Sequence, residues 1–382
     1  HVSQKPALDG IRVFEIGSSV AGPYGAWILA QFGAEVIKIE KPGAGDDARH
    51  WGPPFWHGSA AYFQALNRDK RGVTVDFKNP EEVNRIKQLI IDTGDVVLQN
   101  FRPGLVGEMG ISAADIRSKN STIIYCNIGA FGDAGPYKER RGYDPLMQAS
   151  AGLMSVTGEG GDRPPVRVGT SIIDMGTGMW TAMGIMAAIR QRDTSGEGCT
   201  IDASLYETAL AWMTYHAAAF DASGEIPKAA GSGMNAIVPY QAYECSDGYL
   251  VVAAGGDSLF VKLSKVLGFP EWPDDPRFAT NPDRVQNREV INSAITEVMQ
   301  KKSRAYWQEA LQEGGIPNAP ILHMGEVLDH PQTEALGIVQ QDPTNPDMRL
   351  VGLPMKFDGD RPPYRNSPPA LGQDNDDIFG KD

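Results

Sequence analysis

The chain has 382 residues, of which 41% are hydrophobic and 22% are charged, and its 35 basic and 48 acidic side chains give a net charge of -13. This length predicts about two domains, and this composition excludes a disordered or collagen-like chain. The negative charge argues against nucleic acid and an anionic membrane surface as partners. Any phosphate-bearing ligand must therefore meet a local cluster of cations.

The chain opens with the pattern of a strand, a helix and a second strand over residues 11–40. This order predicts a parallel sheet with helices packed on it. Glu40 ends the second strand at about the place where a dinucleotide-binding fold has an acidic residue. However, Gly17, Gly22 and Gly25 do not have the G-x-G-x-x-G spacing of that fold, so the pattern supports nicotinamide binding only weakly.

Cations lie beside the next two strands of the pattern. Residues 67–71, Asn-Arg-Asp-Lys-Arg, precede a strand expected at 72–76 and fit either a solvated turn or a clamp for phosphate groups. Arg102 follows a strand expected at 95–100. Because open α/β sheets bind ligands at the carboxyl ends of their strands, Arg102 is a candidate binding residue. A further strand is expected at 121–127.

Residues 168–189 form a small and apolar run in which Asp174 is the only ionisable side chain. Apolar residues at 175, 179, 182, 183 and 186 have helical spacing, which predicts a core helix with Asp174 in its first turn. The run approaches membrane-span length, but its carboxylate and glycines favour a core helix, and we expect no membrane role. Asp174 fits an N-cap, and it also fits a catalytic carboxylate that the helix N-terminus keeps ionised.

A composition break at 223–233 predicts a linker to a second, smaller unit. Two β-rich runs flank Ser246-Asp-Gly248, the pattern of a β-hairpin. Helices are expected across 257–268, 288–300 and 303–313, so this unit is α+β.

Three cysteines, Cys126, Cys199 and Cys245, lie far apart without a C-x-x-C pair. This pattern indicates neither a disulfide framework nor a zinc site, so we expect reduced thiols, no metal and a cytoplasmic location. Residues 1–6 lack the charged-then-apolar order of a signal peptide, which favours the same location.

Six short segments occur in an order that carries more information than any one of them. They are Ala-Gly-Pro at 21–23, Val-Ile-Lys-Ile-Glu at 36–40, Asn-x-x-Lys-Arg at 67–71, Asn-Phe-Arg-Pro-Gly at 100–104, Gly-Tyr-Asp at 142–144 and Ser-Ile-Ile-Asp-x-x-x-Gly at 171–178. In this order the chain resembles, over nearly its whole length, the class III CoA-transferases, also called the CaiB/BaiF or formyl-CoA transferase family.

The resemblance implies an α/β fold with a large Rossmann-like parallel-sheet domain that is built from both chain ends. On this basis residues 1–200 and 330–382 form the large CoA-binding domain, 201–224 a linker helix region and 225–329 a small α+β domain. Two chains are expected to interlock as a homodimer.

The resemblance also implies the site residues. The family nucleophile is an aspartate that matches Asp174, and the expected catalytic residues are Asp174, Asp144, Val20 and Tyr143. The expected CoA-binding residues are Ser19, Ala21, Lys41, Lys70, Arg71, Asn100, Phe101, Arg102 and Arg141. Glu108 stands where formyl-CoA transferase has a basic phosphate ligand, and Arg102 is the candidate substitute. Backbone N–H groups near Val20-Ala21 and Gly255-Gly256 are candidate oxyanion stabilisers.

The implied reaction moves CoA from an acyl-CoA donor to a free carboxylic acid through an acyl-aspartyl anhydride and an aspartyl-CoA thioester. Residues 237–243 and 247–249 resemble the succinyl-CoA:glutarate type, which suggests succinyl-CoA as a donor and dicarboxylates as partners. Val20 stands in place of a glutamine of formyl-CoA transferase, which argues against formate and oxalate.

Two other readings remain open. One is a 2-methylacyl-CoA racemase on the same fold, although the chain has no His between 58 and 215, where that branch has a catalytic base. The other is a non-catalytic or nicotinamide-binding α/β protein.

Overall fold

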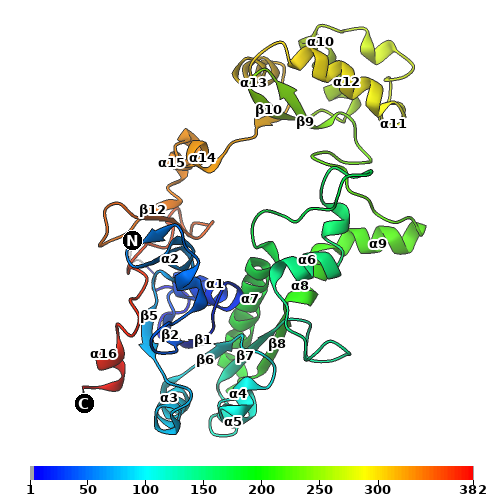
Figure 1. Cartoon of the computed structure of the whole chain (residues 1–382). Helices are drawn as coiled ribbons and strands as arrows, with labels where there is room; N and C mark the ends of the chain where they lie inside the picture. Colours follow the sequence, from blue (N-terminus) through cyan, green and yellow to red (C-terminus); the bar gives the residue numbers. More distant parts are fainter. Residues whose placement is uncertain (1–3, 382) are drawn as a thin grey trace. The chain divides into compact units, whose positions relative to one another are not determined.

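The computed structural model describes residues 4–381, so the expectation for residues 1–6 lies partly outside the described residues. The described chain divides into two compact units (Figure 1). The first contains residues 4–153, 168–214 and 331–381, and the second contains 154–167 and 215–330. The segment 201–224, expected as a linker region, is thus divided between the two units.

A six-stranded parallel sheet forms the centre of the first unit, with the strand order β5-β2-β1-β6-β7-β8. The strands are β1 (Arg12–Ile16), β2 (Glu35–Glu40), β5 (Arg71–Thr74), β6 (Val96–Gln99), β7 (Ile124–Gly129) and β8 (Thr200–Ser204). This is the strand order of a doubly wound fold, and the direction of winding reverses between β1 and β6. The parallel-sheet α/β prediction is confirmed.

Helices cover both faces of this sheet, because successive strand residues point to opposite sides. Val13 packs into a core with α1 (Ala21–Gln31) and α7 (Ile172–Ser195), whereas Phe14 packs into a second core with α3 (Pro80–Thr93) and α5 (Ala113–Arg117). The helices of this unit are α1 (Ala21–Gln31), α2 (Ala61–Asn67), α3 (Pro80–Thr93), α4 (Leu105–Glu108), α5 (Ala113–Arg117), α6 (Asp144–Ser150), α7 (Ile172–Ser195), α8 (Leu205–Trp212), α15 (Pro331–Leu336) and α16 (Asn375–Phe379).

Helix α7 buries its small residues and leaves several of its large residues exposed. The large residues Met179 and Met183 are 43% and 44% exposed, and the buried side carries small residues such as Gly178 and Ala182. The reason is a close crossing with α1, since a Cβ on Gly178 would lie 2.9 Å from the carbonyl oxygen of Ala21. By length and composition α7 could cross a membrane, but half of its most apolar window is buried in the structure.

The C-terminal segment covers the edge strand β5 with side chains. Asp374 Oδ2 accepts a hydrogen bond from the Gly72 N–H, and Asn375 Oδ1 accepts one from the Thr74 N–H, both at 2.8 Å. These contacts satisfy backbone donors that an edge strand otherwise exposes. The chain after Gly372 is therefore held against the sheet at the start of α16.

The second unit has its own core and a three-stranded antiparallel sheet in the order β11-β10-β9. The predicted hairpin is confirmed, with Gly248 paired to Cys245 across the turn. The elements are β9 (Tyr240–Cys245), β10 (Gly248–Ala253), β11 (Asn318–Pro320), α9 (Thr214–Ser223), α10 (Asp257–Leu267), α11 (Asn281–Gln286), α12 (Arg288–Met299), α13 (Arg304–Glu313) and α14 (Met324–Leu328).

Smaller elements complete the chain. They are the strand pairs β3 (Phe55–Trp56) with β4 (Ser59–Ala60) and β12 (Val339–Gln341) with β13 (Arg349–Val351), and the 3-10 turns Asp47–His50, Met154–Val156 and Trp272–Asp274.

Candidate active site

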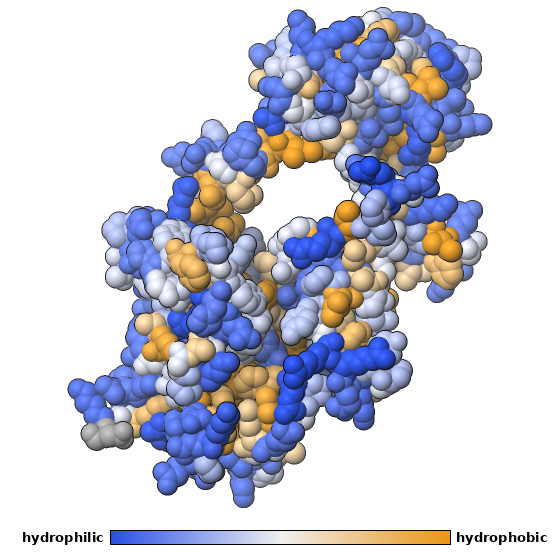
Figure 2. All heavy atoms as spheres, in the orientation of Figure 1, coloured by the Kyte–Doolittle hydropathy of each residue, from blue (hydrophilic) through white to orange (hydrophobic). Residues whose placement is uncertain are grey.

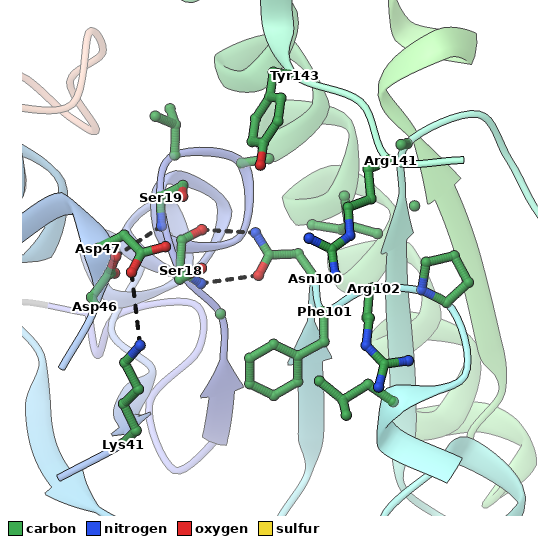
Figure 3. Close-up of a pocket in the computed structure, with 18 of the residues that line it drawn as sticks. Ser18, Ser19, Lys41, Asp46, Asp47, Asn100, Phe101, Arg102, Arg141 and Tyr143 are labelled. Atoms are coloured by element: carbon green, nitrogen blue, oxygen red, sulfur yellow. Dashed lines mark hydrogen bonds and ion pairs between the residues drawn. The ribbon is translucent and has the colours of Figure 1, made fainter. Parts of the chain in front are cut away.

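A pocket of about 690 Å³ opens at the carboxyl edge of the parallel sheet. Its walls come from the residues that follow β1, β2, β5, β6 and β7, together with Tyr143 and Asp174. The loops after β1 and β6 meet where the winding direction reverses, which is the general ligand-binding position of such sheets. Figure 3 shows that Asn100 and Phe101 lie centrally in this pocket.

Asp174 lies in the first turn of α7 and lines the pocket half-buried. Burial, and secondarily the negative charge of Asp144, raises the pKa of Asp174 to about 7. The pKa of this carboxylate thus lies above its ordinary value, although the helix N-terminus was expected to favour the ionised form. The site therefore holds a carboxylate that gains or loses its proton near neutral pH.

The N-cap reading of Asp174 is wrong, because another residue makes the capping contacts. Asp144 Oδ2 accepts hydrogen bonds from the N–H groups of Ile173 and Asp174, at 2.7 and 3.0 Å. Asp144 Oδ1 accepts from Gln148 Nε2 at 2.6 Å, and Gln148 Oε1 accepts from the Val168 N–H at 2.8 Å. The buried carboxylate of Asp144 thus caps α7 from the start of α6, and it is not among the pocket-lining residues.

The close crossing of α1 and α7 places the start of α1 beside the start of α7. A Cβ on Gly25 would lie 3.0 Å from the Gly178 carbonyl oxygen, so neither glycine position has room for a side chain. Gly178 lies one helical turn after Asp174. The Asp-x-x-x-Gly segment therefore couples the position of the carboxylate to α1, whose first residue, Ala21, also lines the pocket.

Cations surround the pocket at several of the expected positions. Lys41, Arg102 and Arg141 line it, and Figure 3 shows Lys41 on the opposite side of Asn100 from the two arginines. Arg102 is already paired, with its Nη2 at 2.9 Å from Glu108 Oε2. Arg141 has no ion pair among the residues described.

Two further cations line the pocket that the sequence patterns did not single out, Lys78 and Arg140. Lys78 follows β5, so the strand-end rule that selected Arg102 could also have found it. Arg140 directly precedes the expected Arg141, and its guanidinium lies 3.7 Å from the centre of the Tyr137 ring.

Lys70 and Arg71 lie outside the pocket lining, in contrast to the expected phosphate clamp. Lys70 is buried, and its Nζ binds Glu15 Oε1 at 2.5 Å and donates to the Pro23 carbonyl oxygen at 2.8 Å. Arg71 pairs with Glu35 at 2.9 Å and with Asp377. Both cations are thus paired with carboxylates of this chain, and neither belongs to the candidate CoA site.

The remaining expected residues line the pocket. They are Ser19, Val20, Ala21, Asn100, Phe101 and Tyr143. Tyr143 is 64% exposed, so a ligand could cover its ring. Glu40 also borders the pocket, but both oxygens of its carboxylate accept hydrogen bonds from Arg49, at 2.7 and 2.8 Å, which balances its negative charge.

The sequence profile of CoA-transferase family III matches residues 8–375, and the chain therefore belongs to this family. The expected class of enzyme is confirmed. A crystal structure of a CaiB/BaiF family protein from Brucella suis is similar to this chain with a TM-score of 0.91 and 36% identity, over 98% of this chain and 99% of that one.

Two relatives are CoA-transferases that are named for their substrates. The succinyl-CoA:glutarate CoA-transferase of Mus musculus is 37% identical over 374 residues, which cover 97% of this chain and 85% of the relative. The succinyl-CoA:D-citramalate CoA-transferase of Chloroflexus aurantiacus is 33% identical over 384 residues, which cover 99% and 94%. The names of both relatives contain succinyl-CoA and a dicarboxylic acid.

Proposed function

We propose that this protein transfers CoA from succinyl-CoA to a free dicarboxylic acid, with Asp174 as the nucleophile. The observation that carries the proposal is the half-buried carboxylate of Asp174, with a pKa of about 7, in a pocket at the carboxyl edge of the sheet. A carboxylate that burial makes more basic is a better nucleophile than a fully solvated one. Burial also favours the uncharged forms of Asp174, which include its anhydride and its thioester.

The proposed reaction proceeds by successive nucleophilic attacks. The Asp174 carboxylate attacks the thioester carbonyl of the donor, the C–S bond breaks, and an anhydride and CoA thiolate form. The thiolate attacks the aspartyl carbonyl, which releases the donor acid and leaves an aspartyl-CoA thioester. The acceptor carboxylate next attacks this thioester, and the thiolate that leaves attacks the acceptor carbonyl of the new anhydride. Acyl-CoA departs and the Asp174 carboxylate is restored.

Each attack places negative charge on a carbonyl oxygen, which needs hydrogen-bond donors. The N–H groups of Val20 and Ala21 at the start of α1 are the donors that we propose. Both residues line the pocket with Asp174, and α1 presents its N-terminus, which favours negative charge. A contribution from the Gly255-Gly256 region remains a prediction.

We further propose that CoA binds along this pocket as a substrate. Lys41, Lys78, Arg102, Arg140 and Arg141 supply the positive charge that its phosphates require, which the chain's overall charge does not supply. Phe101 and the exposed ring of Tyr143 offer apolar surface for the pantetheine arm or the adenine.

A homodimer is part of the proposal. The large side chains Met179, Trp180 and Met183 of α7 are 43%, 54% and 44% exposed, and no residue of α9 is buried. Figure 2 shows hydrophobic atoms at the surface in the region of α9. A second copy of the chain would cover such surfaces, and light scattering at micromolar concentration tests this. A cytoplasmic location stays a prediction from the three cysteines, which are free in this structure.

The test of function is to incubate the protein with succinyl-CoA without an acceptor and to search the Asp174 peptide for a CoA or succinyl adduct by mass spectrometry. Addition of glutarate should discharge the adduct and give glutaryl-CoA. The Asp174→Ala variant should lose adduct and turnover, the latter by about 10³-fold or more. Turnover that survives in Asp174→Ala rejects the nucleophile assignment. Deuterium exchange at the α-carbon of a 2-methylacyl-CoA without an adduct would favour a racemase.

A further inference from the structure

The loop between β1 and α1 is held by two side chains from other parts of the first unit (Figure 3). Asn100 Oδ1 accepts a hydrogen bond from the Ser18 N–H at 2.9 Å, and Asn100 Nδ2 donates to the Ser18 carbonyl oxygen at 2.8 Å. Asp46 Oδ1 accepts from the Ser19 N–H at 2.9 Å. The amide of Asn100 thus pairs with Ser18 on both sides, as a neighbouring β-strand would.

The loop needs this support because its conformation is unusual. Ser19 has a φ of 70°, in the left-handed region that residues other than glycine seldom adopt. The Gly17 carbonyl oxygen accepts from Lys38 Nζ at 3.2 Å. Together with the contacts of Asn100 and Asp46, every backbone polar group from the Gly17 carbonyl to the Ser19 N–H has a partner inside the protein.

The glycines of this region make room for the Asn100 side chain. A Cβ on Gly17 or on Gly22 would approach atoms of the Asn100 amide to 3.3 Å, closer than most carbon contacts allow. These two glycines, together with Gly25 at the helix crossing, are the ones that did not fit a dinucleotide motif. Their spacing is instead explained by Asn100 and by α7.

Asp46 is itself fixed by a buried group of charges. Its Oδ2 lies 2.8 Å from Lys38 Nζ, and Lys38 Nζ lies 2.5 Å from Glu15 Oε2. Burial lowers the pKa of Lys38, but the carboxylates of Asp46 and Glu15 raise it more, so the net pKa lies above its usual range. Lys70 binds the other oxygen of Glu15, so the ammonium groups of Lys38 and Lys70 balance the carboxylates of Glu15 and Asp46. Lys38, which holds Asp46, therefore remains charged.

The next backbone donors along the chain have no such partner. Among residues 4–381, nothing accepts a hydrogen bond from the N–H of Val20 or Ala21. Because the peptide units of Ser18 and Ser19 set the direction of the chain, they also set where these two N–H groups point.

We propose that Asn100 and Asp46 are positioning residues, which fix Ser18 and Ser19 and thereby aim the N–H groups of Val20 and Ala21 at the oxyanion formed next to Asp174. The inference rests on the proposed acyl transfer. It gives Asn100 a role different from the expected contact with CoA. It predicts that loss of the Asn100 contacts slows the chemical step and leaves the binding of acyl-CoA nearly unchanged.

The test is the variant Asn100→Asp, which keeps the size of the side chain but cannot donate to the Ser18 carbonyl oxygen. We expect kcat to fall by about 10- to 100-fold, with KM for succinyl-CoA within about twofold of the wild type. Asn79→Asp is the matched control, since Asn79 caps α3 outside the pocket lining and aspartate is an equally good cap. This control should keep both constants.

Amide hydrogen exchange supplies a readout that does not depend on turnover. Peptides that cover residues 17–22 should exchange faster in Asn100→Asp than in the wild type, and unchanged exchange would show that Asn100 does not hold the loop. A raised KM with unchanged kcat would overturn the inference in favour of a direct CoA contact. If the wild type transfers no CoA, the proposed function fails, while the exchange data still test whether Asn100 holds Ser18 and Ser19 in place. Asn100→Ala, which adds no charge, serves if Asn100→Asp does not fold.

Discussion

Asp144 holds the backbone of Asp174 and at the same time raises the pKa of its carboxyl group. The Asp174 N–H donates to Asp144 Oδ2 at 3.0 Å, and the negative charge of Asp144 adds to the effect of burial on Asp174. The Asp144 carboxylate thus accepts the hydrogen bonds of the N–H groups at the start of α7, while the Asp174 carboxylate has no capping role. In the proposed reaction the second carboxylate is the nucleophile.

The pKa of Asp174 predicts the pH dependence of the reaction. Only the ionised form attacks, so the rate of adduct formation should rise about tenfold per pH unit below pH 7 and become constant above about pH 8. Single-turnover measurements with succinyl-CoA between pH 5 and 9 test this. A profile that stays flat down to pH 5 would show that Asp174 has an ordinary pKa.

The same shift predicts how stability depends on pH. The folded pKa of Asp174 lies above its usual 3.8, so between about pH 4 and 7 the folded state binds more protons at this residue than the unfolded state. Its contribution to the free energy of unfolding is therefore fully present below pH 4 and is lost as the pH rises through 7. In Asp174→Asn this loss should disappear, and urea unfolding at pH 5 and pH 8 measures the difference. An equal pH dependence in both proteins would contradict the shift.

Asp144 can be tested with two substitutions that separate its two effects. Asp144→Asn removes the charge but keeps an oxygen acceptor, so the midpoint of the pH profile should move below 7. It should not reach 4, because burial is the larger cause of the shift. Asp144→Ala also removes the cap and should lower the free energy of unfolding by about 1–2 kcal/mol. A midpoint that stays at 7 in Asp144→Asn would assign the shift to burial alone.

The crossing of α1 and α7 predicts opposite effects for two glycines of the same helix. Gly178→Ala brings a Cβ to 2.9 Å from the backbone of Ala21 and Gly25, so we expect a loss of about 1–3 kcal/mol and a lower kcat. At Gly184 the nearest atom to a Cβ is Ile201 Cγ2 at 3.8 Å, an ordinary contact. Gly184→Ala should therefore stabilise the protein by about 0.5–1 kcal/mol and keep kcat. Urea unfolding and initial rates distinguish the two, and equal effects would argue against the crossing.

The exposed ion pair of Arg102 and Glu108 predicts a change in CoA affinity. Glu108→Gln frees the guanidinium, which should lower KM for succinyl-CoA by about two- to fivefold at low salt, and the gain should shrink at high salt. Arg102→Ala should raise this KM. In the Arg102→Ala background Glu108→Gln should have no further effect, and a double-mutant cycle checks this coupling. Additive effects would show that Glu108 acts on CoA independently of Arg102.

Local patterns predicted the elements and the pocket because both depend on short stretches of sequence. The alternation of strands and helices gave the parallel sheet, and Ser246-Asp-Gly248 gave the hairpin. Arg102 was selected as a cation beside a strand end, and parallel strands bring such residues to one edge; Asn100 and Lys41 were expected there only from the family resemblance. No distant contact is needed for these conclusions.

The contacts between distant segments could not be predicted in this way. Lys70 has the sequence context of a phosphate ligand, but its ammonium group is bound by Glu15, which is 55 positions earlier. On α7, the apolar spacing predicted a core helix but not which side faces inward, and the fit against α1 places the small residues inside. In both cases the partner, and not the local pattern, decides which groups are buried.

The sequence by itself determined that an ionisable residue stands at the start of an apolar helix, after strands whose ends carry cations. Only the tertiary structure decided whether the Asp174 carboxylate caps α7 or lines the pocket without a capping role. Asp144, 30 positions earlier in the chain, takes the backbone N–H groups that a helix-start aspartate would otherwise bind. Burial then raises the pKa of the remaining carboxylate to about 7, because removing a charge from water costs free energy that depends on every segment packed around it.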